Sequence, residues 1–198
     1  MKNIVSFSLT LLFLFSLTFS HAQNKVKWKI DNDHSSVKFN VTHLVVSTVT
    51  GGFTEFEGQL VSGENDDFSG SSVNATIMVN SVDTENMTRD KHLKDEDFFH
   101  AEKYPEIKFV STSFEKKDRN TYSIKGDLTI RDVTKEVELT AEFGGKINAY
   151  DKTLAGFSIK GSINRFDFGL KWDDTLDGGS LIVGEEVELD LDVELVKM

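Results

Sequence analysis

Cysteine is absent from this 198-residue chain, and proline occurs only once. The lack of cysteine excludes disulfide bonds, thiolate metal sites and cysteine nucleophiles. The fold must therefore be held together by burial of apolar side chains. A domain of this length can bury about 70% of its unfolded surface, so it needs no covalent staples.

Basic side chains are also scarce, because 22 Lys and Arg face 33 Asp and Glu and give a formal net charge of −11. This balance argues against nucleic acid as a partner and against docking on an anionic membrane through a basic face. Aromatic rings with a polar group are few, with 3 Tyr and 2 Trp against 16 Phe. The composition favours a single globular domain with a dry, enclosed interior.

The first 22 residues have the layout of a signal peptide. Lys2 gives a short basic start, residues 4–19 form an apolar run diluted by Ser and Thr, and small residues precede Gln23. A retained N-terminal anchor is the disfavoured alternative, because the run is short for a bilayer span. We expect cleavage to leave one domain, residues 23–198, with a net charge of 21 − 33 = −12. The mature chain is expected to be exported to the periplasm or secreted, without stable membrane insertion.

The strongest pattern in the rest of the chain is alternation of apolar and polar residues, which is typical of strands with one dry and one wet face. It is clearest in residues 187–195, where aliphatic and acidic side chains alternate without exception. Turns that contain Gly, Asn or Asp separate such segments. About nine strands are predicted, over residues 26–30, 37–41, 52–61, 73–79, 107–109, 122–130, 137–143, 155–163 and 187–195.

Residues 84–99 break this alternation. The segment is polar, and Met87, Leu93 and Phe98 recur near helical spacing, which predicts a short helix bounded downstream by Pro105. Two roles remain open for it: a lid or plug at one end of a barrel, or a solvated connection.

Two architectures give every strand one dry face, namely a sandwich of two sheets and a single sheet closed into a barrel. Glycines inside the strand patterns, at positions 52, 58, 126, 156 and 161, suit the kinks of a curved barrel wall. We therefore predict an all-β fold, an antiparallel barrel of about eight strands with one short helix. A barrel of that size is filled by side chains or holds one small ligand.

A series of motifs follows in order along the chain, at residues 33–44, 52–58, 81–84, 89–93, 97–99, 103–109, 126–135, 163–169 and 183–187. These motifs resemble those of the YceI-like family of exported polyisoprenoid-binding proteins. The resemblance covers essentially all of residues 23–198. Two positions depart from the family pattern, since Asp132 replaces the usual Gly and Phe166 replaces a small polar residue. Neither belongs to the predicted lumen pattern, so they affect turn details rather than the fold.

The resemblance implies an extended, lipocalin-like barrel with a long isoprenoid or fatty chain in an apolar lumen. It implies no catalytic residues. We also expect no metal, and no cofactor other than the bound lipid. The expected function is non-enzymatic binding, transport or storage of an isoprenoid-type lipid, such as a polyprenol or a quinone. The inward phase of the strands predicts the lumen contacts: Val37, Phe39, Val41, Phe53, Ile77, Val79, Phe109, Ile124, Leu128, Ile130, Leu139, Phe143, Phe157, Ile159, Val187, Leu189 and Leu191.

Residues 164–172 combine aromatic and charged side chains in a glycine-containing loop near the end of a strand. Arg165, Phe168 and Trp172 are predicted to frame the mouth of the barrel, with Arg165 or Lys171 facing a polar or anionic head group. The alternative is an ordered turn held by an internal pair between Arg165 and Asp167.

The rival hypothesis is a metal-dependent or acid/base hydrolase that uses His34, His43 and His92. A metal site needs converging ligands, and His34 and His43 lie 43 − 34 = 9 positions apart, an odd offset that places them on opposite faces of one strand. His34 and Asp33 are instead expected to set a turn, and His92 to hold the helix through hydrogen bonds. A homodimer that pairs the open ends of two barrels is left open.

Overall fold

The computed structural model describes residues 25–64 and 67–198, so the predicted signal peptide lies outside the described residues. The strands are β1 (Val26–Ile30), β2 (Ser36–His43), β3 (Ser47–Phe53), β4 (Phe56–Ser62), β5 (Ser72–Met78), β6 (Val82–Asp83), β7 (Glu106–Lys116), β8 (Thr121–Ile130), β9 (Val133–Ala149), β10 (Lys152–Asn164) and β11 (Val183–Lys197). One α-helix, α1 (Met87–Leu93), and three 3₁₀ turns, η1 (Asn32–His34), η2 (Val79–Ser81) and η3 (Arg165–Phe168), complete the elements.

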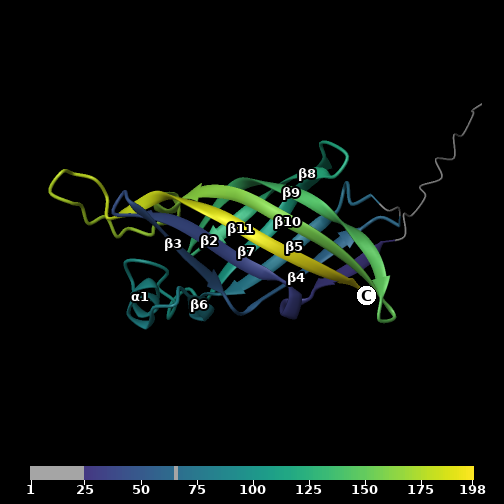
Figure 1. The fold of residues 1–198 in the computed structure, drawn as a ribbon, viewed down its shortest axis with the longest axis horizontal. Coiled ribbons are helices and arrows are strands. Elements are labelled where there is room, and N and C mark those ends of the chain that lie inside the picture. The colour runs from purple at the N-terminus through teal and green to yellow at the C-terminus, as the bar shows by residue number, and fades with distance from the viewer. Residues whose placement is uncertain (1–24, 65–66) are drawn as a thin grey trace, which may run out of the picture.

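The strands form one antiparallel sheet that closes on itself (Figure 1). Its order is β1-β4-β5-β7-β8-β9-β10-β11-β2-β3-β6, and a further pairing between β1 and β11 closes the ring. Short breaks divide three long strands into the pairs β1/β2, β3/β4 and β5/β6, so the wall is an eight-stranded barrel. The predicted all-β barrel with one short helix is confirmed.

Two of the predicted strands differ in detail from the observed ones. Alternation predicts one continuous strand over residues 52–61, but the strand breaks at Thr54 and Glu55 between β3 and β4. The amide of Thr54 donates a hydrogen bond to the carbonyl of Ser81 across this break. The predicted strand 73–79 likewise ends at Met78, because Val79 begins η2. Alternation of residue types cannot reveal such breaks, since the inward and outward phases resume after them.

The two ends of the barrel are built differently. At the end that carries the C-terminus, an aromatic cluster fills the interior with Trp28, Phe68, Phe114, Tyr122 and Phe157. Phe68 lies at its centre, with ring centroids 5.4 Å from Trp28 and 5.1 Å from Phe157. We call this group the aromatic plug.

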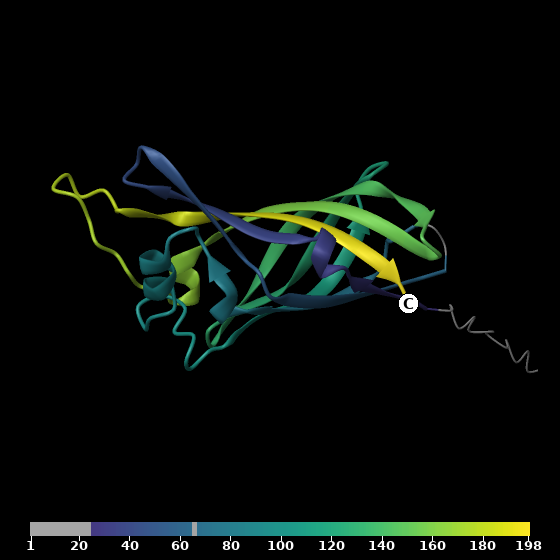
Figure 2. The ribbon, with the colours of Figure 1, turned by 60° about the horizontal axis from the view of Figure 1, so that its bottom comes forward.

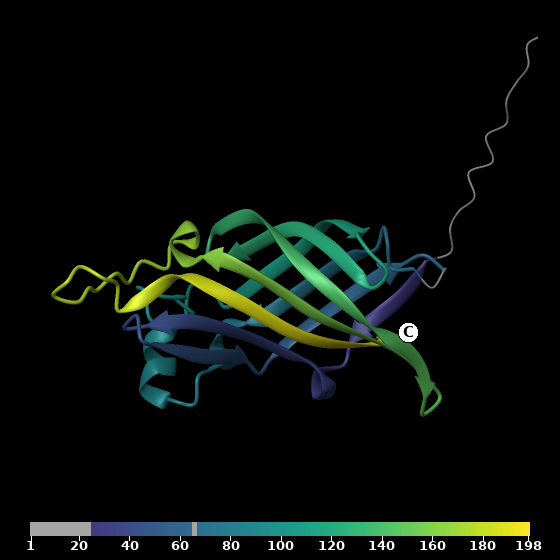
Figure 3. The same cartoon turned by 45° about the horizontal axis from the view of Figure 1, so that its top comes forward.

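The opposite end is covered by segments outside the barrel wall. Helix α1 and η3 both lie at this end, and the loop of residues 171–182 extends from it (Figures 2 and 3). Apolar side chains from these segments, including Phe98, Phe168 and Leu170, pack against Leu128 and Ile130 of β8. Helix α1, η3 and residues 171–182 are not strands of the sheet, so they cover this end without belonging to the barrel wall.

The barrel wall leaves no room for a side chain at Gly126 of β8. A Cβ atom at this position would lie 2.5 Å from the Phe109 ring and 2.6 Å from the carbonyl oxygen of Val110. Gly126→Ala is therefore expected to lower the free energy of unfolding by about 1–3 kcal/mol, the usual cost of overpacking. Gly156→Ala is the matched control, because nothing lies within 4 Å of a Cβ there. Urea unfolding of both variants measures the difference, and equal losses would contradict the packing described.

Candidate ligand cavity

The middle of the barrel is hollow. Inward-facing side chains in the central part of the wall, among them Phe39, Ile159 and Leu189, remain partly accessible, whereas inward-facing side chains of the aromatic plug are buried. A close-packed interior would bury both sets alike. The accessible surface of the central residues therefore belongs to an internal cavity.

This cavity has a volume of about 240 Å³. That is close to the lower end of the roughly 300–1,000 Å³ typical of small-molecule sites. It is also elongated. Its lining on β11 includes alternate residues from Val187 to Leu195, and 195 − 187 = 8 steps at about 3.3 Å each span roughly 26 Å along the strand. A long, narrow apolar space suits a linear chain better than a compact ring system.

The predicted lumen residues line this cavity, with two exceptions, Val79 and Phe143. Val79 is buried in η2, where the 3₁₀ turn directs it into the packing beneath α1. Phe143 has the predicted phase on β9, but it lies at the level of the aromatic plug, with its ring centroid 5.4 Å from Phe68 and 5.2 Å from Phe157. Contact of the other residues with a ligand remains a prediction.

The sequence interpretation missed several lining residues. Many belong to strand positions in the same phase as predicted ones, and alternation alone identifies them: Ile30, Phe56, Leu60, Val73, Ala75, Ile107, Phe114, Val137, Ile163, Val183, Val193 and Leu195. Others, namely Leu93, Phe98 and Phe99, come from α1 and the turn after it. Of the two roles left open for this segment, the structure thus shows the lid.

Polar contacts hold this lid in place. His92 lies 3.0 Å from Asp97 through Nε2 and Oδ2, and its ring stands edge-on to Phe98 and Trp172. From the turn after β8, the Nη1 atom of Arg131 donates hydrogen bonds to the carbonyls of Glu96, Phe98 and Gly169, at 3.0, 2.9 and 2.8 Å. As expected, His92 stabilises the helical segment, and Arg131 joins that segment to the loop after η3.

The three predicted mouth residues are separated by the structure. Arg165 lines the cavity, whereas Phe168 is buried in the packing of the covered end. Trp172 stacks on Phe98 with ring centroids 5.8 Å apart, outside the lining. The side chain of Arg165 bonds to backbone carbonyls rather than to Asp167, which is exposed, so the alternative of an internal pair is wrong.

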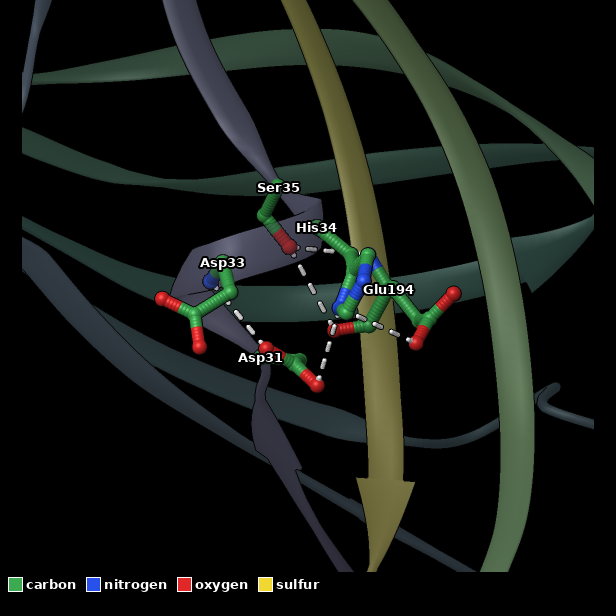
Figure 4. A network of polar contacts seen from close by, with 5 residues as sticks. All are labelled: Asp31, Asp33, His34, Ser35 and Glu194. Carbon is green, nitrogen blue, oxygen red and sulfur yellow. Dashed lines mark hydrogen bonds and ion pairs between the residues drawn. The ribbon is translucent and has the colours of Figure 1, made fainter. Parts of the chain in front are cut away.

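A second polar cluster lies on the outside of the wall where η1 interrupts the first long strand (Figure 4). His34 Nδ1 is 3.3 Å from Asp31 Oδ2 and 3.9 Å from Glu194 Oε1. Asp31 also accepts a hydrogen bond from the Asp33 amide. Burial raises the pKa of Asp31, but the hydrogen bonds from His34 and Asp33 outweigh it and hold this pKa below its usual value. The cluster fixes the turn before β2, as expected for Asp33 and His34.

The structure does not bring together the three histidines of the rival hydrolase hypothesis, His34, His43 and His92. Within residues 25–64 and 67–198, the group of three potential metal ligands found by geometry is Asp31, His34 and Glu194, and it includes neither His43 nor His92. His43 ends β2, His34 precedes the same strand, and His92 belongs to α1. The geometry therefore gives no joint role to the three histidines.

The structure is thus an antiparallel barrel with one filled end, a helical segment over the other end and an apolar internal cavity. The chain matches the YceI-like domain over residues 28–195, and it belongs to that family. It is 35% identical over 170 residues to a UPF0312 protein of Staphylococcus epidermidis, covering 85% of this chain and 96% of that protein.

Two solved structures share the barrel. BcnA of Burkholderia cenocepacia has a TM-score of 0.73 at 23% identity, over 83% of this chain and 98% of BcnA. A polyisoprenoid binding domain from Saccharophagus degradans has a TM-score of 0.59 at 14% identity, over 85% of this chain and 97% of that domain. At these identities, the likeness shows the fold. No helix in the described part of the chain is long and apolar enough to cross a bilayer.

Proposed function

We propose that this protein binds one long-chain isoprenoid-type lipid, such as a polyprenol, a quinone or a similar amphiphile, and carries or stores it without chemical change. The observation that supports this proposal is the elongated apolar cavity of about 240 Å³. Engineered apolar cavities of about 150 Å³ stay dry and take up apolar molecules. A larger cavity with such a lining is therefore better occupied by hydrocarbon than by water.

Two further observations support the ligand class. The structural relative from Saccharophagus degradans is described as a polyisoprenoid binding domain, and it has the same barrel. The lining side chains are also overwhelmingly aliphatic and phenylalanine, with Arg165 as the buried exception. Such a lining can hold a hydrocarbon chain along its length, but it offers few groups for acid/base or nucleophilic chemistry.

The proposal includes export. The signal-peptide pattern of residues 1–22 predicts a periplasmic or secreted protein, in which an apolar internal cavity would shield a lipid from water on its way between membranes. Secretion of a reporter fused to residues 1–30, with the fusion cleaved before Gln23, would test this part of the proposal separately.

The ligand itself can be identified from purified protein. Native mass spectrometry of the mature chain is expected to show one added mass, and organic extraction is expected to release a molecule with several prenyl or methylene units. The extraction should be repeated after expression in a different host. Because the cavity is proposed to select a class of chain, both hosts are expected to yield a molecule of that class. Recovery of the bare polypeptide from every preparation, together with tight zinc binding, would refute the proposal.

A further inference from the structure

Arg165 is an unusual residue for its surroundings. It begins η3, where the side chain of Asn164 caps the turn by accepting a hydrogen bond from the Phe166 amide. Only 3% of Arg165 is exposed, and it is the one buried charged residue in the described segments of the chain. Its side chain also lines the cavity, whose buried lining is otherwise apolar.

The charge of Arg165 has no carboxylate partner. Nε donates to the carbonyl of Gly184 at 2.8 Å, Nη1 to that of Leu170 at 2.9 Å, and Nη2 to that of Val183 at 3.0 Å. Arg165 forms no ion pair with any of the residues that the structure describes, 25–64 and 67–198. Asp173 and Glu185 act on it only at longer range. Carbonyl dipoles orient the guanidinium, but they do not neutralise its charge.

An unneutralised buried cation is costly, because burial removes the water that would otherwise stabilise it. Burial accordingly lowers the pKa of the Arg165 guanidinium from its usual value, although an arginine stays protonated at neutral pH. An anion brought into the cavity would compensate for this cost. The site is therefore complementary to a ligand that carries negative charge at one end.

The hydrogen-bonding capacity of Arg165 fits the same conclusion. A guanidinium has five N–H donors, and three of them are used by the carbonyls of Gly184, Leu170 and Val183. One hydrogen on each Nη atom is left. Two such donors on one rigid planar group match the two oxygens of a carboxylate or phosphate.

We propose that Arg165 binds the anionic oxygen head group, a carboxylate or a phosphate monoester, of the lipid whose chain fills the cavity. This inference rests on the proposed lipid-binding function. It adds the chemistry of the head group and the orientation of the lipid in the cavity. The head lies under the lid at η3, and the chain runs along β10 and β11 toward the aromatic plug. Of the two cations considered from sequence, the structure selects Arg165, since Lys171 is exposed and lies outside the lining.

Three compounds with the same C20 prenyl chain test this assignment: geranylgeranoic acid, geranylgeranyl phosphate and the neutral alcohol geranylgeraniol. Their dissociation constants for the delipidated wild-type protein can be measured at pH 7.4 by displacement of a fluorescent apolar probe. The acid and the phosphate are expected to bind at least tenfold more tightly than the alcohol. Inorganic phosphate alone is expected not to displace the probe, because it lacks the chain.

Variants then assign the preference to one side chain. Arg165→Gln is expected to bring the ratio of acid to alcohol affinity close to one, while the affinity for the alcohol stays similar. Arg165→Lys should keep part of the preference, since it keeps the charge. Lys171→Gln removes an exposed cation six positions away (171 − 165 = 6) and is expected to leave the ratio unchanged.

Each contrary result has a distinct meaning. Equal affinity of wild-type protein for all three compounds would overturn the head-group assignment but leave lipid binding intact, and this measurement needs no variant to fold. A preference for anions that persists in Arg165→Gln would overturn the role of Arg165. A wild-type protein that binds none of the three compounds would refute the proposed function, and the head-group assignment with it.

Discussion

Ile159→Glu is expected to abolish lipid retention while the barrel remains folded. Ile159 faces the cavity from β10, between Ala141 of β9 and Leu191 of β11. A glutamate there would place an unpaired carboxylate against the hydrocarbon chain, which costs at least about 2–3 kcal/mol and weakens binding roughly 30- to 150-fold. The hollow interior can admit water around the new carboxylate, so global unfolding is not expected. Native mass spectrometry and circular dichroism report the two effects separately.

Lys160→Glu provides the matched control, because the next residue along β10 is exposed on the outer face. It should change the free energy of unfolding by no more than about 0.5 kcal/mol and keep the lipid. Phe157→Glu, by contrast, is expected to unfold the protein, since Phe157 belongs to the aromatic plug. If Lys160→Glu lost the lipid and Ile159→Glu kept it, the facing of β10 described above would be wrong.

Phe68→Ala is expected to lower the free energy of unfolding by about 3–5 kcal/mol, the range found when a buried phenylalanine is truncated. Phe68 is 3% exposed and contacts Trp28, Phe143 and Phe157. For a chain of this size, each kcal/mol lowers Tm by roughly 2–4 °C. Differential scanning calorimetry should therefore show a decrease in Tm of about 6–20 °C.

The loop before β5 holds Phe68 in this position. The carboxylate of Asp67 accepts hydrogen bonds from the Ser69 amide at 3.0 Å and the Tyr122 hydroxyl at 3.3 Å. The Ser69 amide holds the pKa of Asp67 below its usual value. Tyr150→Ala is the control for removal of an aromatic ring, because Tyr150 is 93% exposed at the β9–β10 turn, and its Tm should hardly change. Equal changes in both variants would show that the plug contributes little to stability.

Alternation in the sequence was sufficient to predict which face of each strand turns inward. The clearest case is β11, where Val187, Leu189 and Leu191 all line the cavity. Alternation does not report the position of a residue along the barrel axis, however. Phe143 therefore shares the phase of Leu139 but lies at the level of the aromatic plug. It also carries no information on how a chain turns at the end of a strand, which decided the position of Val79.

The lid and the mouth were harder to predict for a different reason. Helical spacing of Met87, Leu93 and Phe98 predicted a helix, but the surface that a helix covers depends on tertiary contacts, and Met87 in fact points to solvent. In the segment 164–172, composition could not separate Arg165 from Lys171. The distinction arises from the backbone carbonyls of Leu170, Val183 and Gly184, which converge on Arg165 only in the folded chain.

The aromatic plug gives the cavity a property that an open-ended barrel would not have. A tube with a fixed floor acts as a molecular ruler: with the head at Arg165, a chain that is too short leaves empty space above Phe157, and one that is too long pushes its head out beneath α1. Affinity should therefore peak at one chain length and decline on both sides of it. Selection among lipids of one chemical series would then rest on the distance between two side chains, rather than on any group that recognises the repeating unit.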